Sequence, residues 1–143
     1  MKRHVIGRVD ELPPGTQRRV ELDGRAVAVF NVRGTFYALR DVCPHQGAPL
    51  SCGVVISELT ARAPGEYELH AERKHVRCPW HGWEYDLATG QSWYDPANDR
   101  VRAYEVAVET GAELLTAAGR APGPYTAETV QISVDGEYVV VEA

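Results

Sequence analysis

Two short segments of this chain carry the same combination of residues: Cys43-Pro44-His45-Gln46-Gly47-Ala48 and Cys78-Pro79-Trp80-His81-Gly82-Trp83. Each offers one thiol and one imidazole within a turn that contains proline and glycine. Adjacent residues of a strand point to opposite faces of a sheet, whereas a turn can direct two side chains at one point. Proline restricts φ, and glycine lets the backbone approach a bulky ligand. The four candidate metal ligands are Cys43, His45, Cys78 and His81.

The rest of the chain has the pattern of short strands joined by glycine-containing turns. The continuous apolar run Ala26–Phe30 is typical of a strand buried on both faces. Asp23-Gly24 is a two-residue turn suited to a tight hairpin, and Asp135-Gly136 predicts a second one that joins Thr129–Val134 to Glu137–Val141. Few windows have helical periodicity. The pattern therefore predicts an all-β sandwich or small barrel.

Composition limits the class of protein. The chain has 143 residues, enough for one domain, and 15 Lys and Arg against 20 Asp and Glu give a net charge of −5. This balance argues against a partner bound through its phosphates, such as a nucleic acid. The sequence contains neither a signal-peptide pattern nor a membrane-spanning apolar run. Three cysteines, an odd number, favour reduced thiols or metal ligation over a disulfide framework. We therefore expect a cytoplasmic protein without a membrane partner.

Two loops that each supply one cysteine and one histidine meet the requirement of a mixed-ligand 2Fe–2S cluster. The paired motifs resemble the Rieske 2Fe–2S family, above all its soluble ferredoxins and the N-terminal domains of ring-hydroxylating oxygenases. The resemblance implies a Rieske-type β-sandwich with a cluster-binding subdomain made of two ligand loops, and one 2Fe–2S cluster. It also implies that Cys43 and Cys78 hold one iron, and that His45 and His81 hold the other near the surface.

The resemblance extends to the surroundings of the ligands, for which it implies five supporting residues: Gly47, Gly82, Trp83, Tyr85 and Pro96. Tyr85 stands where high-potential members have a tyrosine that donates to a ligand sulfur. Trp83 stands where those members have a serine donor. Because a lost donor destabilises the reduced cluster, we expect a potential in the lower half of the roughly −150 to +300 mV Rieske range.

The resemblance also implies how the chain is organised. We expect a single Rieske domain over 1–143, with a cluster-binding subdomain at about 41–96. Two segments look inserted relative to the simple ferredoxins, at about 57–74 and 111–128. The first of them lies within the 32 residues that separate His45 from Cys78.

Other interpretations of the cysteines and histidines remain open. Two Cys and two His also satisfy tetrahedral zinc, although zinc sites usually begin with a closely spaced pair of cysteines. Cys52 is expected to be a small buried apolar residue rather than a ligand. His70 and His75 are expected to be solvated polar positions.

The function that follows is transfer of one electron between a flavin reductase and a non-haem iron terminal oxygenase. The chain has no Gly-x-Gly-x-x-Gly nucleotide motif and is too short to include an oxygenase catalytic domain, so we expect an electron-carrier component rather than an enzyme by itself. The alternatives are a small iron–sulfur subunit of a larger reductase, such as a nitrite reductase, and a redox-sensing module.

Overall fold

The structure is a computed structural model that describes residues 3–44, 47–80, 82–92, 99–115, 120–122 and 129–143. The strands are β1 (Arg3–Arg8), β2 (Gln17–Leu22), β3 (Arg25–Val32), β4 (Thr35–Arg40), β5 (Val54–Ala63), β6 (Glu66–Arg77), β7 (Glu84–Asp86), β8 (Ala103–Thr110), β9 (Arg120–Pro122), β10 (Thr129–Gln131) and β11 (Glu137–Glu142). Two 3-10 turns cover Val9–Glu11 and Leu50–Cys52, and helix α1 covers Gly111–Leu115. The expected all-β class is confirmed.

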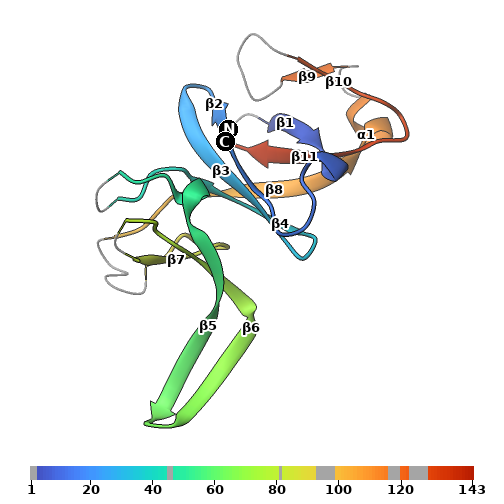
Figure 1. Ribbon diagram of the computed structural model, residues 1–143. Helices are drawn as coiled ribbons and strands as arrows, with labels where there is room; N and C mark the ends of the chain where they lie inside the picture. The colour runs from blue at the N-terminus through green and yellow to red at the C-terminus, as the bar shows by residue number, and fades with distance from the viewer. Residues whose placement is uncertain (1–2, 45–46, 81, 93–98, 116–119, 123–128) are drawn as a thin grey trace.

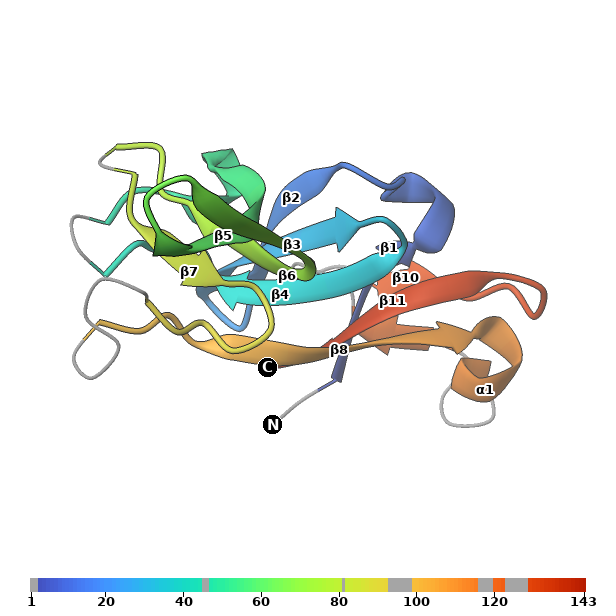
Figure 2. The same ribbon diagram turned by 90° about the horizontal axis from the view of Figure 1, so that it is seen from below.

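The strands form three antiparallel sheets (Figure 1). The largest has the order β1-β11-β8-β4-β3-β2, the second has the order β5-β6-β7, and β9 pairs with β10. Figures 1 and 2 show the three-stranded sheet beside β3 and β4, with the far end of the β5–β6 hairpin projecting away from the six-stranded sheet. The two larger sheets therefore meet through β3, β4 and the bases of β5 and β6.

Strand β3 joins the two main parts of the core. Val27 and Val29 belong to a cluster of buried side chains within the six-stranded sheet. Ala28 and Phe30, which point to the opposite face, belong to a second cluster that also contains Cys43 and Cys78. All four β3 side chains are fully buried. The prediction of a strand buried on both faces is confirmed, and this strand connects the sheet core to the candidate ligands.

The two predicted hairpins had different outcomes. Asp23 and Gly24 both have positive φ and join β2 to β3, as predicted for a tight two-residue turn. The hairpin predicted at Asp135-Gly136 is wrong, because β11 is hydrogen-bonded to β1 on one edge and to β8 on the other. With both edges of β11 occupied, β10 pairs with β9 instead.

Two predictions about burial are also wrong. His75 is 1% exposed rather than solvated, because β6 is the middle strand of its sheet and places this residue between β5 and β7. Cys52 is exposed rather than buried. It ends a three-residue turn whose buried residue is Leu50, so the turn directs one side chain inward and leaves the cysteine outside. The side chain of His70 lies outside the described part of the structure.

Helix α1 follows β8 directly and has five residues. Its first residue, Gly111, donates its N–H to the carbonyl of Gly136 at 2.7 Å, and a Cβ at this position would overlap the carbonyl oxygen of Ser133. A glycine is therefore required where the helix meets the turn before β11. In the part of the chain that the structure describes, no helix has the length and apolar character needed to cross a membrane.

Candidate metal centre

The first ligand turn is closed by backbone hydrogen bonds around Cys43. Its N–H donates to the carbonyl of Ala48 at 2.8 Å, and its carbonyl accepts from the N–H of Gly47 at 2.7 Å. A buried carboxylate, Asp41, then ties the start of the loop to its end, because it accepts from both the N–H and the hydroxyl of Ser51 at 2.6 Å. No pattern in the sequence marks Asp41, although it stands only two residues before the cysteine.

The second ligand turn repeats this geometry. Cys78 donates its N–H to the carbonyl of Trp83 at 2.7 Å and accepts from the N–H of Gly82 at 3.0 Å. In both turns the bonds therefore join the cysteine to the residues four and five positions later. The glycine has φ near +79° in the first turn and +73° in the second, a region that other residues avoid. An ion pair between Arg77 and Glu84 at 3.0 Å joins β6 to β7 across the second turn.

The structure brings the two cysteines into one buried cluster, together with Phe30, Leu50 and Tyr85. Cys43 is 1% exposed and Cys78 is 3% exposed, and neither forms a disulfide. Soft thiolates select zinc or iron–sulfur clusters, and a buried charge is stable when it is paired or bound to metal. Two buried thiols in matched turns therefore fit a 2Fe–2S cluster. The other predicted ligands, His45 and His81, and the supporting Pro96 lie outside the described residues.

The hydroxyl of Tyr85 lies between the sulfur of Cys43 and a carboxylate. It is 3.4 Å from Sγ of Cys43 and donates to Oδ2 of Asp99 at 3.1 Å. Burial, followed by the contact with Cys43 and the charge of Asp99, raises the pKa of Tyr85 well above its usual value, so the hydroxyl keeps its proton. A hydroxyl has one proton to donate. Because Asp99 receives it, the sulfur is left without this donor. No feature of the sequence pointed to Asp99.

The remaining predicted supporting residues are all close to the turns. Gly47 and Gly82 make the hydrogen bonds described above, and Trp83 is partly buried against the cluster that contains both cysteines. Tyr85, in β7, is fully buried. Gly47, Gly82, Trp83 and Tyr85 therefore all lie close to the two buried thiols.

Comparison with known proteins agrees with this geometry. A family profile described as the Rieske [2Fe-2S] domain matches residues 2–105. The 3-phenylpropionate/cinnamic acid dioxygenase ferredoxin subunit of Escherichia coli (strain K12) is 33% identical over 103 residues, which cover 72% of this chain and 82% of that protein. Apoptosis-inducing factor 3 of Homo sapiens is 33% identical over 105 residues, but this chain spans only 15% of its length.

Solved structures show the same fold. The ferredoxin of carbazole 1,9a-dioxygenase from Nocardioides aromaticivorans IC177 has a TM-score of 0.60 and 29% identity, covering 76% of this chain and 91% of that one. A protein assigned as an NADH-dependent nitrite reductase small subunit from Mycobacterium tuberculosis has a TM-score of 0.65 over 99% of this chain and 96% of that one, at 22% identity. With the two matched turns and the family match over most of its length, this chain belongs to the Rieske family and carries one 2Fe–2S cluster.

Proposed function

We propose that this chain is a one-electron carrier, a ferredoxin component that passes electrons from a flavin reductase to a non-haem iron terminal oxygenase. The observation that carries the proposal is the pair of matched turns, each of which places a buried cysteine in the same core cluster. In this proposal the cluster is held by Cys43, His45, Cys78 and His81, and when bound it takes up and releases one electron.

The residues around the turns have separate tasks in this proposal. Phe30 and Leu50 exclude water from the thiolates, because both are fully buried and pack in the same cluster as the cysteines. Asp41 holds the first loop closed through Ser51. Tyr85 donates its hydroxyl proton to Asp99, so the sulfur of Cys43 does not receive a hydrogen bond that would stabilise the reduced state.

The proposed partners are redox proteins, and two features of the chain support them. Relatives with similar sequences are ferredoxin components of dioxygenases, and the net charge of −5 favours association with a partner that presents a basic face. We place the chain in the cytoplasm. We also propose that it is one Rieske domain over 1–143 with a cluster-binding subdomain at about 41–96, and that the segments at about 57–74 and 111–128 are insertions that affect partner choice.

A second candidate function is the small subunit of a larger reductase. One observation favours it: the likeness to the nitrite reductase small subunit extends over 99% of this chain, whereas that to the carbazole dioxygenase ferredoxin covers 76%. At 22% identity this likeness shows a common fold and does not by itself show a common function. A carrier exchanges partners, so we expect the purified chain to run alone in size-exclusion chromatography. A stable complex with a larger reductase would favour the second function.

The ligand assignment is tested by replacing the three cysteines one at a time. Cys43→Ser and Cys78→Ser should each abolish the visible absorption of the as-purified protein and the iron and sulfide found by analysis. Cys52→Ser is the matched control, because this cysteine is exposed, and it should keep both. Stoichiometric zinc without colour in the wild type would refute the proposed cluster.

Electron transfer is tested separately by a dithionite titration followed by rapid mixing. The loaded protein should take up one electron per chain and lose it to an oxidised terminal oxygenase purified from the same organism. Reduction without onward transfer to any such oxygenase would contradict the carrier function while leaving the cluster assignment intact.

A further inference from the structure

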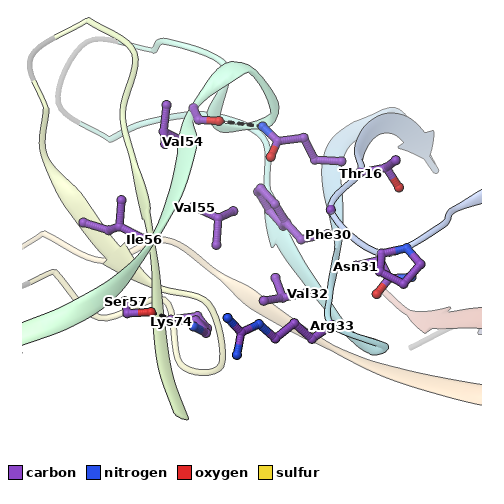
Figure 3. A pocket seen from close by; sticks show the side chains of 14 residues that line it. Thr16, Phe30, Asn31, Val32, Arg33, Val54, Val55, Ile56, Ser57 and Lys74 are labelled. Carbon is purple, nitrogen blue, oxygen red and sulfur yellow. Dashed lines mark hydrogen bonds between the residues drawn. The ribbon is translucent and has the colours of Figure 1, made fainter. Parts of the chain in front are cut away.

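A pocket of about 760 Å³ lies between the six-stranded and the three-stranded sheet (Figure 3). One side is formed by the end of β3 and the segment before β2, and the other by the beginning of β5 together with Lys74 of β6. Gln17 links the two sides, since its amide donates to the carbonyls of Ser51 at 2.5 Å and of Gly53 at 2.6 Å. Pockets that bind small molecules have volumes of roughly 300–1,000 Å³, so this one is of suitable size.

Part of the pocket wall is apolar. Figure 3 shows Val55 of β5 on one side and Phe30 and Val32 of β3 on the other. Phe30 is fully buried, and Val32 and Val55 are partly buried against the same cluster of side chains. Val32 and Val55, which keep some exposed area, therefore form a surface on which an apolar group of a ligand can pack.

One end of the pocket is positively charged. Arg33 and Lys74 both line it, and Figure 3 shows the guanidinium of Arg33 extending toward Lys74 and Ser57. Lys74 donates to the neutral hydroxyl of Ser57 at 2.6 Å. Among the described residues that line the pocket there is no Asp or Glu, although acidic residues outnumber basic ones in the chain by 20 to 15. Two cations that converge without a lining carboxylate favour an anionic ligand.

The backbone conformation of Arg33 also indicates a role for its charge. Arg33-Gly34 is the two-residue turn between β3 and β4, and Arg33 has φ of +52°. Asn and Asp are the residues that this turn position favours before glycine, whereas a long side chain in the left-handed region costs stability. The turn is held in place by Asn31, whose side chain accepts from the N–H of Gly34 at 2.8 Å. An arginine kept at an unfavourable position and aimed into a pocket indicates a role for its charge.

We propose that this pocket binds a small organic carboxylate with an apolar body. The carboxylate lies between Arg33, which can make two parallel hydrogen bonds to it, and Lys74. The apolar body lies against Val32 and Val55. A carboxylate fits better than a phosphate, because a bare phosphate would make no use of the apolar part of the wall and no described helix N-terminus lines the pocket. Nothing in this inference depends on which redox partners the chain has.

The test is calorimetric titration of the cluster-loaded protein with hexanoate and with benzoate. We expect saturable binding of at least one of them, and none by acetate, hexan-1-ol or inorganic phosphate at the same concentrations. Acetate lacks the apolar body, hexanol lacks the charge, and phosphate tests for a site that selects only an anion. Absence of saturable binding by both carboxylates, or equal binding of hexanol or phosphate, would overturn the proposal.

Variants separate binding from folding. Arg33→Asn removes the cation and places a residue in the turn that prefers its backbone conformation, so it should weaken carboxylate binding at least tenfold while the thermal midpoint stays the same or rises. Lys74→Gln should also weaken binding at least tenfold. Arg25→Gln is the control, because Arg25 is exposed at the start of β3 and does not line the pocket. Wild-type affinity in Arg33→Asn would refute the assigned role of the arginine.

Discussion

The proton of the Tyr85 hydroxyl is donated to Asp99 rather than to the sulfur of Cys43, and this arrangement can be tested by changing the carboxylate. In Asp99→Ala the hydroxyl loses its acceptor at 3.1 Å, and the remaining partner is Sγ of Cys43 at 3.4 Å. The hydroxyl should then donate to the sulfur. Since a donor to a ligand sulfur stabilises the reduced cluster, the reduction potential should rise.

The size of the hydrogen-bond effect follows from ordinary energies. A net hydrogen bond contributes about 0.5–1.5 kcal/mol, and a one-electron potential changes by about 59 mV for each 1.4 kcal/mol. The new bond should therefore raise the potential by about 20–65 mV. Removal of the Asp99 charge adds a second effect of the same sign. The contacts of the Tyr85 hydroxyl with both groups place the Asp99 oxygen within about 6.5 Å of the sulfur. At that distance two unit charges interact by about 0.6 kcal/mol in water and by about 2.5 kcal/mol at an effective dielectric constant of 20.

A double-mutant cycle separates these effects, because the charge effect is also present when residue 85 has no hydroxyl. Potentials are measured by spectroscopic redox titration of the wild type, Tyr85→Phe, Asp99→Ala and the double variant. We expect Tyr85→Phe alone to change the potential by less than about 20 mV, below the effect of one hydrogen bond. Asp99→Ala should raise it about 20–65 mV more in the presence of Tyr85 than in its absence. If Tyr85→Phe lowers the potential by that amount and the two Asp99→Ala effects are equal, the hydroxyl already donates to the sulfur and the reasoning fails.

Three further predictions concern stability. Asp41→Ala leaves both donors of Ser51 without their acceptor, so it should lower the free energy of unfolding by about 2–3 kcal/mol and speed loss of the cluster. Equal cluster retention in the variant and the wild type would contradict the role of Asp41 in closing the first loop. Phe30→Ala should lower the free energy of unfolding, measured in urea, by about 3–5 kcal/mol, because this fully buried side chain belongs to the cluster that contains both cysteines. A loss below about 1 kcal/mol would argue against tight packing of that cluster. Gly90→Ala should give little folded protein, because its Cβ would overlap a backbone carbonyl. Gly65 also has positive φ but open space around it, so Gly65→Ala should lower the free energy of unfolding, followed by circular dichroism, by only about 1–2 kcal/mol.

Features that depend on neighbouring residues were predictable from the sequence. The Asp23-Gly24 turn follows from the backbone preference of its own two residues, and its hairpin formed as predicted. The uninterrupted apolar run in β3 implied burial on both faces, which the structure confirms. The Asp135-Gly136 hairpin failed although its turn residues are equally favourable, because β1 and β8 occupy both edges of β11. Strand pairing is decided by distant segments, which local patterns do not report.

Burial of single polar residues was less predictable for the same reason. His75 is surrounded by charged residues in the sequence but lies in the middle strand of its sheet, whereas Cys52 has an apolar character but ends an exposed turn. Both outcomes depend on which face of a segment meets the rest of the protein. The candidate site shows a similar division: the cysteines and the glycines of the two turns were identified in advance, while Asp41 and Asp99 were not.

The sequence by itself determined the all-β class, the two Cys/His turns and the family to which they belong, because turn chemistry and side-chain alternation act over a few residues. The family resemblance already implied that Cys43 and Cys78, 35 positions apart, lie close together, but only the tertiary structure decided which side chains bury them. It also decided that Asp99 reaches Tyr85 and that Arg33 and Lys74 converge on one pocket. These contacts join segments that are separated in the sequence, so they depend on how the whole chain packs.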